Sequence, residues 1–175
     1  MELKGNIIKI RPIQVEDTDY IIKWRNRPSV KSQFIYQKDL TREEHLNWMQ
    51  NMVATGKVAQ FIIIDLETNA PIGSTFLRDI DTVHSKAEFG IFIGEGIMRG
   101  KGMGTDAIKL TSQYGFEHLK LNRIFLRILA DNLASINSCR KAGFTQEGIF
   151  RKEVFVNGKF CDVLYMGMLK EEYQG

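Results

Sequence analysis

The chain contains few of the residues from which disulfide frameworks and metal sites are built. Among its 175 residues are two cysteines, Cys139 and Cys161, which are too far apart in sequence for a C-x-x-C pair, and three histidines. A structural zinc site is therefore not expected, and we assign no residue to a metal. Because nothing indicates a disulfide framework, a reducing, cytoplasmic location is expected.

Long apolar runs and a strong charge imbalance are also absent from the sequence. The N-terminal segment lacks the apolar run and small-residue cleavage site of a signal peptide, and no stretch of apolar residues is long enough for a membrane span. The formal net charge of +3 is mildly basic and does not indicate nucleic-acid binding. With 43% hydrophobic and 26% charged residues, the composition is that of an ordinary globular protein, and we expect a single domain over residues 1–175.

Apolar periodicity and turn signals predict a mixed α/β (α+β) sheet domain. Strands are expected at residues 6–12, 60–66, 72–80, 87–94, 123–130 and on both sides of Asn157–Gly158, a dipeptide that favours a type I′ hairpin. Helices are expected at 15–26, at 41–53, from the glycine-rich stretch to about Phe116, and at 133–143. Thr41 and Glu44 have the spacing of a capping box, and Gly143 is placed to end the last helix.

The stretch GIMRGKGMGTDAIKL, residues 96–110, raises the main functional question. Its glycines follow an expected strand and precede an expected helix, as in phosphate-binding loops. A P-loop would need Lys-Ser or Lys-Thr after the glycines, which this stretch lacks. A dinucleotide-binding fingerprint would need G-x-G-x-x-G and an acidic residue about twenty positions later, where Leu121 and Asn122 stand. A tight turn alone would not call for three glycines flanked by cations.

What remains is Arg99-x-x-Gly102-x-Gly104, which resembles the Q/R-x-x-G-x-G/A loop that binds the acetyl-CoA pyrophosphate in GNAT acetyltransferases. Backbone N–H groups in such a loop and the positive end of the following helix form an anion cradle, to which Arg99 and Lys101 add charge. The resemblance implies that acetyl-CoA is the donor and that it is held by a contiguous run: Arg99, Gly100, Lys101, Gly102, Met103, Gly104 and Thr105.

The resemblance extends over nearly the whole chain. The segments IRPIQVEDT, AEFGIFI, YGFEHLKLNR, ADNLASINSCRKAGFTQEG and VNGKFCD occur in the order found in the RimJ/RimL-like branch of that family. It implies the GNAT fold, a mixed, largely antiparallel sheet flanked by helices and splayed at the acetyl-CoA cleft. It also implies an acyltransferase, in which a primary amine attacks acetyl-CoA directly in a ternary complex. Relatives often dimerise through their terminal strands, so a homodimer is compatible with the resemblance.

The strand AEFGIFIG indicates where the chemistry would take place. Period-2 alternation puts Glu88, Gly90 and Phe92 on one face, so that a carboxylate lies beside an open glycine. Glu88 is the leading candidate for a general base, directly or through a water, or for an anchor of the amine; a plain salt bridge is the alternative. His84 is a second candidate for contact with the substrate, and an exposed loop position is its alternative.

Further contacts with the donor are implied by the resemblance. The backbone of Ile91, Phe92 and Ile93 resembles the bulged strand that accepts the pantetheine arm, with one N–H facing the thioester oxygen. Asn132 corresponds to the family asparagine that bonds pantetheine near the sulfur, a role compatible with a helix N-cap. Asn137 is a weaker candidate for contacting the cofactor.

Cys139 departs from the family pattern, because many relatives carry a tyrosine there that gives a proton to the leaving thiolate. A cysteine at this catalytic position could be a weak donor or simply a buried apolar residue. Water could take the acid role instead, or the thiolate could leave unaided, and Ser135 is another nearby hydroxyl. An acyl-enzyme on Cys139 is not favoured, because the sequence pairs no histidine with it.

The acceptor is expected to be bound by the first hundred residues. Residues 23–49 resemble the WRN-x-P-x-V…H-x-x-W pattern of the sugar-nucleotide N-acetyltransferases of pseudaminic acid biosynthesis, and Trp24, His45 and Trp48 are part of the match. The resemblance implies that the acceptor is the amino group of a nucleotide-linked aminodideoxy sugar. The residues expected to contact it are Arg25 at a phosphate, Asn26, and the aromatic residues Phe34 and Tyr36. Core packing is the alternative for the two tryptophans.

Three other functions remain open. The segments HSKAEFGIFI and FVNGKF resemble the spermidine acetyltransferases, although a polycation favours an acidic cleft and TREE is the only acidic cluster in the acceptor half. N-terminal acetylation of a ribosomal protein is supported by the branch-level resemblance alone. A module that senses acetyl-CoA without turnover is the non-enzyme alternative, which the cysteine at position 139 keeps open.

Overall fold

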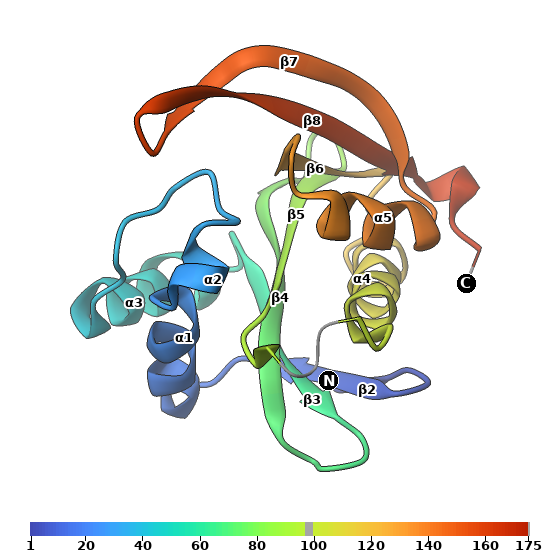
Figure 1. The fold of residues 1–175 in the computed structure, drawn as a ribbon. Coiled ribbons are helices and arrows are strands. Elements are labelled where there is room, and N and C mark those ends of the chain that lie inside the picture. The colour runs from blue at the N-terminus through green and yellow to red at the C-terminus, as the bar shows by residue number, and fades with distance from the viewer. Residues whose placement is uncertain (97–99, 175) are drawn as a thin grey trace.

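One sheet contains all the strands found in residues 1–96 and 100–174, which are the residues that the computed structural model describes. The strands lie in the order β1-β2-β3-β4-β5-β6-β8-β7 (Figure 1). Their bounds are β1 Leu3–Lys4, β2 Ile8–Pro12, β3 Ala59–Asp65, β4 Pro71–Asp81, β5 Lys86–Ile93, β6 Arg123–Leu129, β7 Thr145–Val156 and β8 Lys159–Leu169. Only the β5–β6 pair is parallel within this part of the chain, so the expected mixed, largely antiparallel sheet is confirmed.

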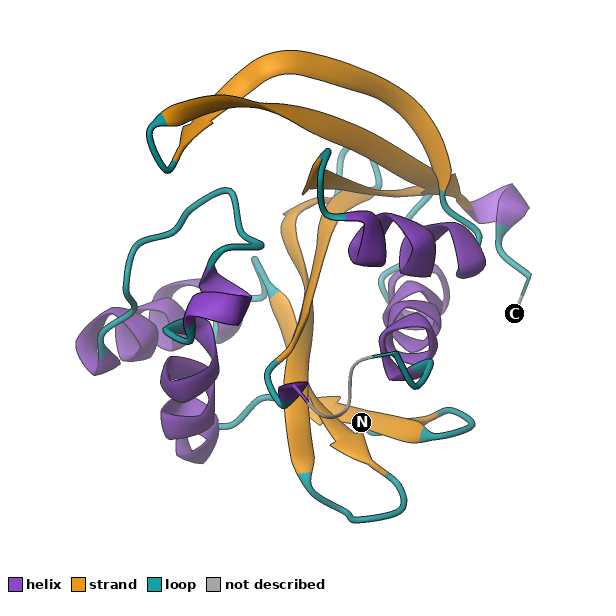
Figure 2. Cartoon of the chain, viewed as in Figure 1, coloured by secondary structure: helices purple, strands orange, loops and turns teal. Residues whose placement is uncertain are grey.

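Helices cover both faces of this sheet. They are α1 Thr18–Arg25, α2 Pro28–Lys31, α3 Arg42–Trp48, α4 Met103–Gln113 and α5 Leu133–Lys141. Two of them continue into a wider turn, α3 at Met49–Val53 and α4 at Tyr114–His118. Figures 1 and 2 show α1, α2 and α3 on one side of the central strands and α4 and α5 on the other. No helix within the described residues is long and apolar enough to cross a bilayer.

Most of the expected elements are confirmed, together with the local signals that predicted them. The Thr41 hydroxyl accepts a hydrogen bond from the N–H of Glu44 at 3.2 Å, and Glu44 Oε2 accepts one from the N–H of Thr41 at 2.9 Å. Asn157 and Gly158 both have positive φ, 51° and 77°, as a type I′ turn requires. Strand β1 and helix α2 were not expected, because each is too short to show a periodic pattern.

The parallel pair β5–β6 separates soon after it forms, which confirms the expected splay. Its ladder joins only Lys86–Glu88 to Arg123–Phe125. Beyond Glu88, β5 stays paired with β4 up to Ile93, whereas β6 stays paired with β8 up to Leu129. Beyond Glu88, β5 is therefore paired only with β4, and its other edge has no neighbouring strand among the described residues.

The alternation predicted for β5 decides which side chains face which helices. Ala87 and Phe89 pack in the buried cluster that includes Ile108 of α4. Phe92 points to the other face, where it packs with Trp24 of α1. The Glu88 side of β5 is thus the side covered by the N-terminal helices.

We expect Gly94→Ala to destabilise the fold, because a Cβ at this position would lie 2.1 Å from Cγ of Trp24, which is fully buried. Overpacking of this kind typically costs about 1–3 kcal/mol in the free energy of unfolding, which urea titration measures. In the matched control, Gly148→Ala, the new Cβ would meet no described atom within 4 Å. Equal stability of the two variants would contradict the packing of Trp24 against Gly94.

Candidate functional site

A cavity of about 350 Å³ opens where β5 and β6 separate. Its walls are formed by the middle of β4, β5 and β6, by the start of α4, by one face of α5, and by residues 30–36. These segments are far apart in sequence and come from both sides of the sheet (Figure 1). The cavity therefore joins the glycine-rich stretch to Glu88, the two features that the sequence singled out.

The glycine-rich end of the cavity is formed by the start of α4. Gly100 and Gly102 have φ of +81° and +84°, in the region that favours glycine, and Gly102 is the N-cap of this 11-residue helix. A Cβ on Gly104 would meet only Ser138 Oγ among the described atoms, at 3.9 Å, so packing within the protein does not require this glycine. Gly104 and Thr105 both line the cavity. Backbone N–H groups at the positive end of a helix, with open space in front of them, suit a phosphate group.

Two described residues of the expected pyrophosphate-binding run, Lys101 and Met103, do not line the cavity. The side chain of Met103 is buried and packs with Ile8 and Ile10 of β2, so its predicted contact is limited to its backbone. Lys101 is exposed and is not part of the lining, so its predicted contact is not found. Arg99 lies outside the described residues, and its part in the loop stays a prediction.

The middle of the cavity is formed by β5. Ile91, Phe92 and Ile93 line it, as the resemblance implied. The predicted bulge at these residues is wrong, because β4 and β5 keep a regular register there and the shift falls between Arg78 and Asp81. The departure of β6 exposes this edge of β5 without a bulge, so a local distortion is not needed.

One face of α5 forms the roof of the cavity. Asn132 lines it and is also the N-cap of α5, where its Oδ1 accepts a hydrogen bond from the N–H of Ser135 at 3.2 Å. Ser135, Ser138 and Lys141 continue the same face at intervals of three residues. Asn137 is exposed and is not among the lining residues, so its contact with the cofactor stays a prediction.

Cys139 lies in the core rather than in the cavity. It is fully buried among apolar side chains that include Ile136 and Phe144. Burial raises the pKa of its thiol to about 12, and a hydrogen bond with Ser135 opposes this only in part. The prediction of a catalytic role is therefore wrong: the thiol lies in the core and does not line the cavity, and its raised pKa disfavours both proton donation and a thiolate nucleophile.

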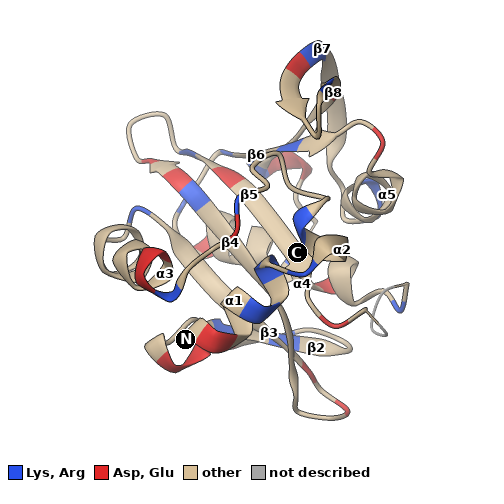
Figure 3. Ribbon diagram, turned by 60° about the vertical axis from the view of Figure 1, so that its left-hand side comes forward, with Lys and Arg blue, Asp and Glu red and all other residues tan. Residues whose placement is uncertain are grey.

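Glu88 is held by two arginines from the strands on either side of it. It is 5% exposed, and its Oε1 accepts hydrogen bonds from Arg78 Nη2 at 2.8 Å and from Arg127 Nε at 3.1 Å. Its Oε2 accepts a third bond, from Arg127 Nη2 at 3.1 Å. Arg78 stands opposite Glu88 in the β4–β5 ladder, and Figure 3 shows basic and acidic segments next to one another on these strands.

The two guanidiniums decide the protonation state of Glu88. Burial acts to raise the pKa of its carboxyl group, but the hydrogen bonds and charges of Arg78 and Arg127 outweigh burial and bring the pKa below 4.5. A carboxylate held in this way is a weak proton acceptor. The geometry thus favours the ion-pair and anchoring alternatives for Glu88 over the general base.

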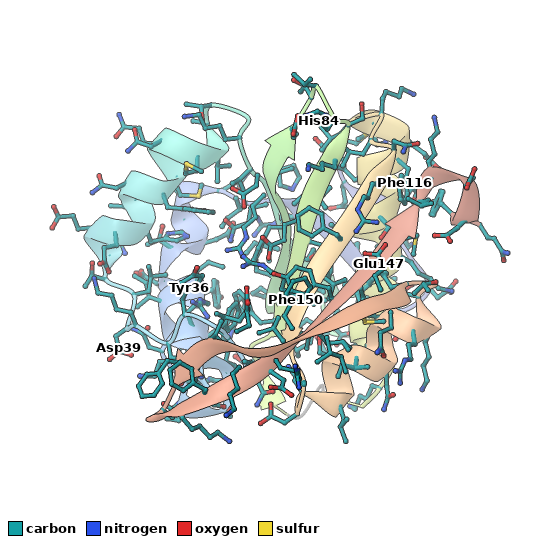
Figure 4. The ribbon with its side chains drawn as sticks, turned by 90° about the horizontal axis from the view of Figure 1, so that it is seen from above. Tyr36, Asp39, His84, Phe116, Glu147 and Phe150 are labelled. Carbon is teal, nitrogen blue, oxygen red and sulfur yellow. The ribbon has the colours of Figure 1, made fainter. Side chains whose placement is uncertain are left out.

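His84 does not reach the cavity. It is exposed in the turn between β4 and β5, where its backbone N–H donates to Asp81 Oδ1 at 2.9 Å. Figure 4 shows it at the outer edge of the molecule, away from Tyr36 and Phe150. Its predicted contact with substrate is wrong, because the turn directs it outward.

Residues 30–36 form the wall opposite α5. Phe34 and Tyr36 line the cavity, as expected for acceptor contacts. Arg25 lies behind this wall, with its Cζ 3.5 Å from the centroid of the Phe34 ring. Asn26 does not face the cavity: its side chain donates to the carbonyl of Leu40 at 3.0 Å and accepts from the N–H of Leu40 at 2.8 Å. The predicted substrate contact of Asn26 is wrong, because its amide fixes the loop that carries Phe34 and Tyr36.

The remaining residues of the W-R-N…H-x-x-W pattern are also structural. Trp24 is fully buried and donates through Nε1 to Glu95 Oε1 at 2.8 Å. His45 is buried with Nδ1 3.1 Å from Thr18 Oγ1, and Trp48 Nε1 donates to Gln60 at 3.0 Å. Packing therefore accounts for the two tryptophans and the histidine without a substrate.

Sequence reasoning missed several polar residues of the cavity, among them Ser138, Lys141, Arg78 and Arg127. Ser138 and Lys141 could have been found by extending the spacing of Asn132 and Ser135 along the helix. Arg78 and Arg127 had no such signal, because only the register of β4, β5 and β6 brings them to Glu88.

Residues 8–145 match the family model described as an acetyltransferase (GNAT) domain. The chain therefore belongs to the GNAT acetyltransferases, and it is an acyltransferase of the N-acetyltransferase type. Acetyl-CoA is the donor that acetyltransferases of this family use.

Known relatives match the chain along nearly its whole length. The uncharacterized N-acetyltransferase p20 of Bacillus licheniformis is 29% identical over 171 residues, which cover 96% of each chain. The spermidine N(1)-acetyltransferase of Escherichia coli is 28% identical over 95% of this chain and 88% of its own length. The crystal structure of the Vibrio cholerae spermidine N-acetyltransferase with CoA and spermine superposes with a TM-score of 0.88, at 25% identity, over 95% of this chain and 97% of that one. These relatives give no support to the expected likeness to the sugar-nucleotide enzymes.

We expect Glu88→Gln to lower the free energy of unfolding by roughly 3 kcal/mol at neutral pH, because it leaves two half-buried guanidiniums without their carboxylate. The pKa of Glu88 is lower in the folded chain than in the unfolded one. Its contribution to the stability of the fold is therefore present above pH 4.5 and is lost as the pH falls through the folded pKa. Denaturation across the acid range should therefore show the difference between wild type and variant shrinking below about pH 4.5.

The control for Glu88→Gln is Asp79→Asn. The Asp79 carboxylate lies 3.9 Å from Arg78 Nε but is 68% exposed, so its loss should change stability by less than about 1 kcal/mol. A Glu88→Gln difference that stays constant with pH would contradict the ion pairs as described.

Proposed function

We propose that this chain transfers the acetyl group of acetyl-CoA to a primary amine, which attacks the thioester directly while both substrates are bound. The observation that carries the proposal is the single cavity that runs from the glycine-rich start of α4, along the free edge of β5, to Glu88. A donor bound at one end and an acceptor at the other would meet beside β5, which removes the need for a covalent intermediate on the protein.

The donor end of the cavity has the chemistry that a CoA pyrophosphate needs. Gly100 and Gly102 adopt the positive φ of the turn that leads into α4, and Gly104 leaves room for the phosphates to approach the N-terminus of this helix. Lys141, which lines the cavity from α5, adds a cation. The pantetheine arm would then follow the edge of β5 that β6 leaves free.

Transfer of the acetyl group forms one C–N bond and breaks the C–S bond of the thioester. A backbone N–H of Ile91, Phe92 or Ile93 would stabilise the negative charge that develops on the carbonyl oxygen. Asn132 and Ser135 line the cavity near the end of this strand and are the side chains available to the departing thiolate. Because a thiolate is a good leaving group, no tyrosine is needed at position 139, and water protonates the thiolate after it leaves.

The acceptor amine loses one proton to water before it attacks and a second as the C–N bond forms. The second proton passes through water to the departing thiolate. Glu88 then acts by holding the two guanidiniums in place, and a separate general base is not required. This role agrees with the low pKa of Glu88.

Polyamines are the acceptor class that the relatives support. Two of the proteins with which the chain aligns over 95% of its length are named for spermidine acetylation, and one of them was solved with spermine. The nucleotide-linked amino sugar has no such support. The positive charge of the cavity, however, favours neither spermidine nor spermine, both of which are polycations.

The proposal is tested by incubating the protein with acetyl-CoA, a thiol reagent and a panel of primary amines. We expect an amine-dependent release of free thiol and the appearance of an acetylated amine in the mass spectrum. Release of thiol in the presence of none of the amines, or equal release without amine, would contradict acetyl transfer.

We expect Gly104→Val to raise the KM for acetyl-CoA by about 10-fold or more, because the new side chain would fill the space in front of the helix N-terminus. Gly148→Val is the control, since that glycine lies on β7 away from the lining residues. Thermal unfolding separates a loss of binding from a loss of fold. An unchanged KM for acetyl-CoA in Gly104→Val would contradict the placement of the pyrophosphate.

A further inference from the structure

The acceptor half of the cavity carries more positive than negative charge. Arg78 and Arg127 line it, and Glu88 is the only carboxylate among the described residues of the lining. Both guanidiniums share that one carboxylate, through bonds of 2.8 to 3.1 Å. One positive charge is therefore left without a counter-charge inside the cavity.

A third guanidinium, that of Arg25, lies directly behind the cavity wall. It stacks on Phe34, which lines the cavity, and its Nη1 is buried without a hydrogen-bond partner in the described part of the chain. The pKa of Arg25 falls to about 10, mainly through burial and then through the charge of Arg78. Arg25 and Arg78 thus repel each other across the same wall.

Within the described part of the chain, Asp79 is the only carboxylate besides Glu88 that is paired with any of these three arginines. Asp79 Oδ2 lies 3.9 Å from Arg78 Nε, a separation too long for a hydrogen bond, and the Asp79 side chain is 68% exposed to solvent that screens its charge. Arg78 Nε itself is buried and lacks a hydrogen-bond partner among the described residues. Half-buried cations that lack part of their counter-charge destabilise a protein unless a ligand supplies the missing charge. Arrangements that cost stability in this way are expected at functional sites.

We propose that the amine acetylated here carries an anionic group, a carboxylate or a phosphate, which binds to Arg78 and Arg127 next to Phe34. The inference rests on the proposed acetyl transfer and specifies its acceptor. The planar guanidinium fork suits both anions, because each offers two oxygens to two N–H donors. A polycation would meet like charges at the same place.

The geometry of β5 sets the distance between the anionic group and the amine. The guanidiniums meet at Glu88. The amine approaches the acetyl group at Ile91–Ile93 from this side, so it is proposed to lie beside Gly90–Phe92, two to four residues farther along the strand. Because a strand rises about 3.3 Å per residue, the separation is roughly 7–13 Å. An α-amino acid is too short for this distance, whereas an ω-amino acid or a nucleotide-linked amino sugar spans it.

The test is a series of amines of equal length and different charge. Aminohexanoate, aminohexanamide and diaminohexane each present the same primary amine on the same chain and end in an anion, a neutral amide or a cation. We expect kcat/KM to be about 10-fold or more higher for aminohexanoate than for diaminohexane, as charge-assisted bonds to guanidinium predict. A uridine-diphosphate-linked amino sugar and the same sugar without the nucleotide test phosphate as the source of the anion, and spermidine is the polyamine arm.

The Arg78→Gln variant tests whether Arg78 is a cation that binds the anionic group of the acceptor. It should lower kcat/KM for the anionic amine by about 10-fold or more while leaving that for the neutral amide within a few-fold. Arg123→Gln is the matched control, because this arginine pairs with Glu147 outside the cavity lining. Arg25→Gln should weaken the same preference through its charge.

The outcomes separate this inference from acetyl transfer itself. A preference for diaminohexane or spermidine, or equal losses for all amines in Arg78→Gln, would overturn the anionic acceptor and leave acetyl transfer standing. Thiol release with no amine of the series or the panel would overturn both.

Discussion

The bonds of Glu88 with Arg78 and Arg127 hold together three strands at the point where the sheet opens. Glu88 is the last residue of β5 that pairs with β6, and beyond it the two strands run apart to form the cavity. Glu88 bonds to one arginine on each neighbouring strand, so its side chain links β4, β5 and β6 where the backbone pairing of β5 with β6 ends. The same three side chains set the charge of this half of the cavity, so the fold and the proposed choice of acceptor depend on one interaction.

Much of the fold could be predicted from the sequence, because its signals are local. The capping box at Thr41 and Glu44, the turn at Asn157–Gly158 and the alternation along β5 each depend on a few adjacent residues. The glycines at the start of α4 indicated an anion site for the same reason: two of them adopt backbone conformations that favour glycine, and the third leaves open space. The donor end of the cavity was therefore the easier half to predict.

The acceptor end could not be predicted in the same way, since it depends on register and side-chain direction. Asn26 matched a family pattern but bonds to the backbone of Leu40, and Cys139 occupied an expected catalytic position but is buried in the core. Conversely, Arg78 and Arg127 match no motif and meet Glu88 only through the pairing of three strands. A pattern of residue types does not show which side chains point into the cavity. In this protein that direction separates the residues that pack within the fold from those that line the site.

The most direct measurement is a crystal structure of the protein with CoA and aminohexanoate bound. The pyrophosphate should lie at the start of α4, in front of Gly104, and the pantetheine arm should follow the free edge of β5. The carboxylate should lie within hydrogen-bond distance of Arg78 or Arg127, with the amine directed toward the CoA sulfur. A carboxylate that points to solvent, or a CoA molecule bound outside the cavity between β5 and β6, would contradict this assignment of the site.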